Sequence, residues 1–214
     1  MKYIICIILS LNLIFSQKML IPMDNTQSNH LKSYGLVYWI LEQDMNVEWL
    51  LNYKGGAFLL NAKNSINNEA TIRGISYNII DASTLNEIYA TIENNNMDIV
   101  LLEKIPKIAV YSPKDKQPWD DAVTLALTYA EIDYDTVFDS EVLAGELKKY
   151  DWLHLHHEDF TGQYGKFYAS FKNATWYKDQ KKDYEDLAKE LGYNKVSKAK
   201  LAVAKKIKEF VIGG

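Results

Sequence analysis

The chain has 214 residues and an acidic balance, with 28 aspartates and glutamates against 24 lysines and arginines and a formal net charge of −4. This balance argues against a nucleic-acid or anionic-membrane partner, because both favour basic patches. The only cysteine, Cys6, lies in an N-terminal apolar segment. The rest of the chain therefore has no disulfide, no cysteine-ligated metal and no cysteine nucleophile.

The first sixteen residues have the layout of a secretory signal peptide. Lys2 supplies a positive charge, residues 3–15 are almost entirely apolar, and Ser16 is a small residue before the polar Gln17. About thirteen apolar residues are fewer than the ~20 that a membrane-spanning helix needs, which argues against an anchor. We therefore predict cleavage after Ser16, a secreted or periplasmic location, no integral membrane segment in the mature chain, and one α/β domain over 17–214.

Strands and helices alternate along the first half of that domain, about residues 18–104. The apolar run 18–23 predicts a strand, and apolar residues at helical spacing over 30–43 predict an amphipathic helix after a polar loop. The same reasoning gives the other elements of this half: strands at 47–53, 74–80 and 98–102, a helix at 83–93, and a polar, Asn-rich connection at 61–68.

The second half, about residues 105–214, has the clearest alternation. Its predicted elements are strands at 107–112, 135–138 and 151–156 and helices at 119–130, 140–147, 179–191 and 197–212. The β-α-β-α-β order predicts a parallel sheet between helices, because parallel strands need a crossover connection. The first half begins in the same order, so we expect two related halves of one architecture.

The last predicted helix carries one apolar face and is followed directly by Gly213-Gly214. That face consists of Leu201, Ala204, Ile207, Lys208 and Val211, and we expect it to pack on the domain. A glycine pair after a helix forms a cap and turn, and in an α/β alternation a strand should come next. We therefore expect that the chain is truncated at its C-terminus.

The mature chain resembles a family of secreted bacterial proteins, most closely at KIAVYSPKDKQPWDDAVTLALTYAEIDYDTVFD (107–139) and YDWLHLHHEDFTGQYGKFYASF (150–171). The resemblance continues in MLIPMDNTQSNHLKSYGLVYWILEQ (19–43) and VEWLLNYKGGAFLL (47–60). It implies a class I glutamine-amidotransferase-like fold, which is three-layered, flavodoxin-like, mostly parallel and related to ThuA-like trehalose-utilisation domains. Members of the family are often labelled asparagine synthetase B.

The residues themselves do not support the synthetase label. Glutamine-hydrolysing asparagine synthetases use an N-terminal cysteine and an SGGxDS-type loop, whereas position 2 is Lys2, cleavage would expose Gln17, and no SGGxDS occurs. Amidotransferase-like folds place their nucleophile after a strand that follows a helix such as 197–212. The resemblance therefore implies that this chain ends before the nucleophile and does not hydrolyse amides.

The most chemically loaded stretch, residues 154–159, lies at the carboxyl end of the predicted strand 151–156. His154 and His156 lie two residues apart, on one strand face, and with Glu158 they could chelate a divalent metal. His30 could reach the same edge. Histidines at strand ends also bond to backbone carbonyls, so a structural or ligand-contacting role is the alternative. We predict no cofactor, with a metal-assisted hydrolase as the competing hypothesis.

Two polar loops are expected to line the same edge, because ligands gather at the carboxyl ends of parallel strands. Our leading prediction is an exported amidotransferase-like domain that binds a small polar ligand, a sugar or an amino-acid derivative, without turnover. An aromatic run from Phe160 to Tyr177 offers a scaffold or partner surface as a third hypothesis. The predicted ligand-contacting residues are Asp24, Asn25, His30, Gln117, Trp119, Asp120, His154, His156, His157, Glu158 and Asp159.

Overall fold

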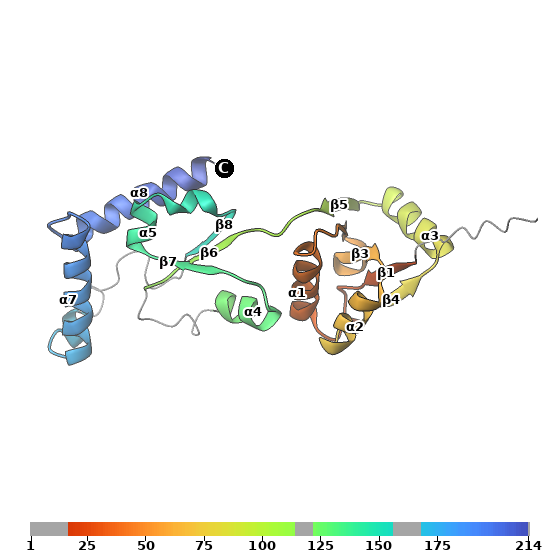
Figure 1. Cartoon of the computed structure of the whole chain (residues 1–214), viewed down its shortest axis with the longest axis horizontal. Coiled ribbons are helices and arrows are strands. Elements are labelled where there is room, and N and C mark those ends of the chain that lie inside the picture. Colours follow the sequence, from red (N-terminus) through yellow and green to blue (C-terminus); the bar gives the residue numbers. More distant parts are fainter. Residues whose placement is uncertain (1–16, 114–121, 156–167, 214) are drawn as a thin grey trace, which may run out of the picture. The chain divides into compact units, whose positions relative to one another are not determined.

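The computed structural model describes residues 17–113, 122–155 and 168–213 and divides the chain into two compact units (Figure 1). The N-terminal unit is Met1–Lys104 and the C-terminal unit is Ile105–Gly214. Each unit contains helices and its own β-sheet, so the chain is a mixed α/β protein. The predicted signal peptide, residues 1–16, lies outside the described residues.

The N-terminal unit is built on one five-stranded sheet of order β4-β1-β3-β2-β5 in which every neighbouring pair is antiparallel. Through β4 the element order is β-α-β-β-α-β, the ferredoxin-like arrangement. Its elements are β1 (Lys18–Ile21), α1 (His30–Leu41), β2 (Val47–Leu51), the one-turn 3-10 helix η1 (Tyr53–Gly55), β3 (Ala57–Asn61), α2 (Asn64–Ile72), β4 (Asn78–Ile80), α3 (Ala82–Glu93) and β5 (Asp98–Leu102).

A tight connection between β2 and β3 makes this sheet antiparallel. Asn52, Gly55 and Gly56 all have positive φ angles there, at 64°, 78° and 90°, which reverse the chain without a crossover helix. A Cβ on Gly55 would lie 2.4 Å from the carbonyl oxygen of Met23, so this turn requires glycine. The expected parallel sheet is therefore wrong for the first half. The polar connection expected at 61–68 is also wrong, because α2 begins at Asn64.

Both faces of the antiparallel sheet are covered. On one face, Leu20, Leu50 and Leu59 pack with Ile88 and Ile92 of α3. Side chains from the other face are also buried, and Tyr34 of α1 contacts the Phe58 ring edge-to-face with centroids 5.7 Å apart. The N-terminal unit therefore has a layer of α1 and α2, a sheet, and a layer formed by α3.

The C-terminal unit has a parallel sheet of order β7-β6-β8, which confirms the predicted β-α-β-α-β alternation. Because β6 is central, the chain passes first to one side of it and then to the other. The elements are β6 (Ile108–Tyr111), α4 (Ala122–Ala130), β7 (Asp135–Val137), α5 (Asp139–Leu143), the 3-10 helix η3 (Glu146–Lys149), β8 (Trp152–Leu155), α6 (Tyr168–Phe171), α7 (Thr175–Glu190) and α8 (Val196–Gly213).

Helix α8 packs on this unit through a different face from the one predicted. Leu201 and Val211 are 51% and 70% exposed, and of the five residues expected to pack only Ile207 is buried. The buried face consists of Val196, Ala199, Lys200, Val203 and Ile207. It joins a core that includes Ala109, Val137, Phe138, Val142, Leu147, Tyr184 and Ala188.

Candidate functional site

A buried lysine, aspartate and tyrosine meet at the carboxyl ends of β6 and β7. Tyr111 is the last residue of β6, Asp139 follows β7 at the start of α5, and Lys200 lies on α8. The Lys200 ammonium lies 2.9 Å from the Tyr111 hydroxyl oxygen and 2.9 Å from each carboxylate oxygen of Asp139. The Tyr111 hydroxyl donates to the same carboxylate. These contacts satisfy the buried charges and tie α8 to the sheet.

Aromatic rings surround the same ammonium group. Its nitrogen lies 4.2 Å from the ring centre of Phe138, 5.0 Å from that of Tyr184 and 5.4 Å from that of Tyr111. Lys200 and Asp139 are only 7% and 2% exposed. Because the amine is enclosed by a carboxylate and three rings, its role in this arrangement is to anchor α8 rather than to meet a ligand.

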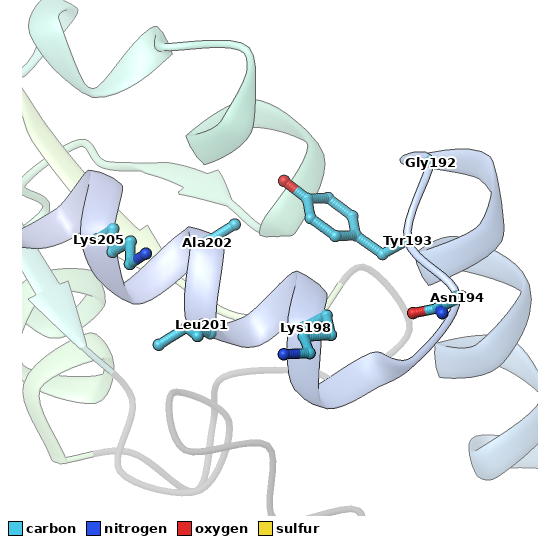
Figure 2. Close-up of a pocket in the computed structure, with 7 residues that line it drawn as sticks. All are labelled: Gly192, Tyr193, Asn194, Lys198, Leu201, Ala202 and Lys205. Carbon is cyan, nitrogen blue, oxygen red and sulfur yellow. The ribbon is translucent and has the colours of Figure 1, made fainter.

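A groove lies on the outward side of the same helix, where α7 connects to α8 (Figure 2). It has a volume of about 630 Å³ and is lined by Gly192, Tyr193, Asn194, Lys198, Leu201, Ala202 and Lys205. Figure 2 shows the ammonium ends of Lys198 and Lys205 directed toward Leu201 from either side, while Tyr193 extends from the connection toward α8. Among the described residues, neither ammonium has a hydrogen-bond or ion-pair partner.

The predicted site residues of the first half lie together in the loop from β1 to α1, where local bonds engage two of them. Thr26 donates to Asp24 from its hydroxyl and from its backbone N–H, and both bonds lower the pKa of the Asp24 carboxyl. The His30 ring nitrogen Nε2 lies 3.2 Å from the Met23 carbonyl oxygen and 3.1 Å from that of Asp24. Asn25 is exposed.

The single sheet edge expected for all predicted site residues does not form. Asp24, Asn25 and His30 belong to the antiparallel sheet, where neighbouring strands end at opposite edges, whereas His154 belongs to the parallel sheet. His154 is half-buried in β8, with its ring 6.4 Å from that of Trp152. The other predicted residues lie outside the described ranges: Gln117, Trp119, Asp120, His156, His157, Glu158 and Asp159.

The predicted metal centre stays a prediction. Within residues 17–113, 122–155 and 168–213, no group of three or more His, Cys, Asp or Glu side chains is placed to hold a metal ion. Two of the three proposed ligands, His156 and Glu158, lie outside those ranges. His154 is therefore the one proposed ligand that the structure places.

The residues that form the buried cluster and the groove were missed at the level of sequence. Lys200 looks like an ordinary surface lysine, yet it lies at helical spacing from Val196, Val203 and Ile207, which are all buried. Treating its position as part of the apolar face would have indicated a buried charge that needs an acidic partner. No comparable pattern marks Lys198 and Lys205, because exposed lysines are common on helices.

No protein-family model, curated protein or solved structure matches the chain. In the parts of the chain that the structure describes, no helix is both long and apolar enough to cross a membrane. The class of protein therefore follows from the fold and the site. It is an α/β protein with one antiparallel and one parallel unit, and the parallel unit carries a basic groove.

Proposed function

We propose that the chain is an exported protein whose C-terminal unit binds a small polar ligand that carries an anionic group. The ligand would be an amino-acid or sugar derivative with a carboxylate or a phosphate. The main support is a pair of ammonium groups, those of Lys198 and Lys205, which line one groove of about 630 Å³ and have no hydrogen-bond or ion-pair partner within residues 17–113, 122–155 and 168–213. In a chain with a net charge of −4, such a local excess of positive charge favours an anion.

The composition of the groove suits a small, mixed ligand. The two lysines lie two helical turns apart, about 10 Å along the axis, and their long side chains can turn toward one anionic group. Tyr193 and Asn194 can exchange hydrogen bonds with hydroxyl or amide groups. Leu201 and Ala202 provide an apolar floor for the carbon skeleton. The groove therefore offers charged, hydrogen-bonding and apolar groups to a small polar ligand.

Binding without turnover is the form of activity that this groove supports. Its seven lining residues include two ammonium groups, a phenol and an amide, and none of the seven is a histidine, aspartate or glutamate that could act as a general base. The enclosed amine of Lys200 faces the opposite side of α8, toward Asp139. We therefore infer recognition of the ligand rather than chemistry on it.

We also infer that the C-terminal unit has a doubly wound, flavodoxin-like sheet. A parallel order of β7-β6-β8 is the order with which doubly wound, flavodoxin-like sheets begin, and the resemblance to amidotransferase-like proteins implies such a sheet. The crossing of the chain from one side of β6 to the other creates a switch point between β6 and β8. Of the predicted ligand-contacting residues that the structure describes, His154 is the one that lies on a strand beside the switch point, near the end of β8.

Calorimetric titration of the purified chain tests the proposal with matched anionic and neutral ligands, such as glutamate against glutamine and gluconate against glucose. We expect the anionic member of at least one pair to bind more tightly. Lys198→Gln with Lys205→Gln should weaken that binding about tenfold, since each exposed ion pair contributes roughly 0.2–1 kcal/mol. Lys208→Gln is the control, because Lys208 is exposed on the same helix outside the groove.

Two results would overturn the proposal. One is equal affinity for anionic and neutral members of every pair. The other is a loss of binding in the Lys208→Gln control as large as that in the Lys198→Gln, Lys205→Gln variant.

A further inference from the structure

Strand β5 presents an apolar edge on the N-terminal unit. It is the last strand in the sheet order and pairs with β2. Its central residues Ile99, Val100 and Leu101 are 36%, 38% and 51% exposed. Exposed apolar edge strands are templates for pairing with another strand, because they offer unpaired backbone groups together with apolar side chains.

The hydrogen-bond pattern of the sheet shows which backbone groups face that edge. Bonded and non-bonded pairs alternate along antiparallel strands. The Ala62 N–H donates to the Gln17 carbonyl at 2.8 Å, so these two residues form a hydrogen-bonded pair between the ends of β3 and β1. From this pair, the registers of β1 with β3, of β3 with β2 and of β2 with β5 show which residues of each strand bond to which neighbour. The even-numbered residues of β5 bond to β2, whereas Ile99 and Leu101 turn their backbone groups outward. The Ile99 N–H accordingly donates to the Asp98 carboxylate at 2.8 Å.

We propose that β5 pairs with β5 of a second copy of this chain, antiparallel and about a twofold axis at Leu101, so that the two sheets join into one. Outward-facing residues must pair with outward-facing residues for the ladder to continue. That condition excludes every register in which an odd-numbered residue lies opposite an even-numbered one. Centres at Val100 and at Leu101 both satisfy it. The centre at Val100 places Ile99 opposite Leu101, whereas the centre at Leu101 pairs Leu101 with itself and Val100 with Leu102 and places Ile99 opposite Glu103.

Charge complementarity selects the centre at Leu101. When the ladder is extended two residues past the end of β5 at Leu102, Asp98 of one copy lies opposite Lys104 of the other in this register, and the twofold axis repeats the pair. With the centre at Val100, Asp98 would instead lie opposite Leu102. Opposite charges directly across an antiparallel pair are stabilising, whereas like charges are destabilising. The Ile99 N–H would then bond to the second copy and release the Asp98 carboxylate for Lys104.

A second copy of the chain is the partner that this edge fits, because Asp98 and Lys104, on either side of the apolar centre, carry opposite charges. Asp98 precedes the exposed apolar residues, and Lys104 follows them after Leu102 and Glu103, so two antiparallel copies can bring each Asp98 opposite a Lys104. The pairing is independent of the ligand groove, which lies on the other unit. Failure of one proposal would therefore leave the other untouched.

Sedimentation velocity of the full chain over a range of concentrations tests the pairing. We expect a reversible dimer. Asp98→Lys and Lys104→Asp should each raise the dimer dissociation constant about tenfold, because two pairs per dimer change from attraction to repulsion. The double variant, which exchanges the two charges, should return the constant to within about threefold of its original value.

A second comparison guards against general effects of charge at the surface. Leu101→Lys places two ammonium groups at the twofold axis and should give a monomer, whereas Ile72→Lys should leave the dimer intact, because Ile72 is 80% exposed on α2. Circular dichroism verifies that each variant is folded. A chain that stays monomeric at all concentrations overturns the proposal. So does a dimer that Leu101→Lys leaves unchanged, or a double charge exchange that fails to restore association.

Discussion

The buried Lys200 ammonium provides the most demanding prediction about the C-terminal unit. Its side chain is 8% exposed and that of Asp139 is 4% exposed, and the two groups are 2.9 Å apart. Lys200→Met preserves most of the apolar length of the side chain but leaves the carboxylate buried without its counter-charge. Removal of one partner from a buried ion pair costs about 3–5 kcal/mol. We expect a loss of this size in the unfolding free energy of the C-terminal unit.

Native-state hydrogen exchange of the β6 amides measures that loss within the C-terminal unit itself. A destabilisation of 3–5 kcal/mol corresponds to a fall in protection of more than about a hundredfold. The double variant Lys200→Met, Asp139→Asn removes both charges and should recover most of the lost unfolding free energy. The reason is that most of the cost of the single variant comes from the one buried charge that it leaves without a partner. A cost below about 1 kcal/mol for Lys200→Met would refute the buried pairing.

Two predictions concern the N-terminal unit. Gly55→Ala should lower the melting temperature of this unit more than Gly74→Ala does. Both glycines have positive φ angles, but only at Gly55 would a Cβ lie 2.4 Å from a backbone oxygen. Equal shifts of the two melting temperatures in thermal denaturation would contradict the turn geometry. Burial, followed by the hydrogen bond to Glu48, raises the pKa of Tyr89 above its ordinary value of 10.0. The contribution of the neutral Tyr89 hydroxyl to stability is thus fully present below pH 10 and is lost as the pH rises further. Urea unfolding at pH 9 and at pH 11 measures this loss as a fall in the free energy of unfolding. The fall should be smaller in Tyr89→Phe than in the original chain or in the Tyr77→Phe control.

The parallel unit was predictable because its signals are local. Apolar runs such as Ile108–Tyr111 alternate with helical segments and polar connections, and this alternation by itself requires crossover helices and parallel strands. The tight connection at Asn52–Gly56 was also visible as a glycine pair. Its consequence was not, because whether a strand returns directly after such a turn depends on pairing with distant residues.

Helix α2 was missed because its apolar signal is sparse. Only Ile66 and Ala70 are buried in a segment rich in asparagine, a residue of low helix propensity. Contacts with α1 supply the stabilisation that the local sequence lacks. The packing face of α8 was misplaced for a related reason, because a buried lysine occupies a position that the binary pattern assigns to solvent.

The candidate site was harder to predict than the fold. Histidines and carboxylates attract attention as ligands, yet the ring of His30 lies within hydrogen-bonding distance of backbone carbonyls and the carboxylate of Asp24 accepts from a neighbouring threonine. The groove instead depends on where the connection after α7 places Tyr193, which lines the same groove as two lysines of α8. That juxtaposition follows from the packing of two helices and has no short sequence signature.

The most direct test of ligand recognition is to map the binding of glutamate and glutamine onto the chain by amide chemical shifts. We expect glutamate, at concentrations where it is bound, to perturb the amides from Gly192 to Lys205 more strongly than glutamine does. The largest changes should surround Lys198 and Lys205. Shifts confined to the N-terminal unit, or identical responses to the acid and to its neutral amide, would contradict it.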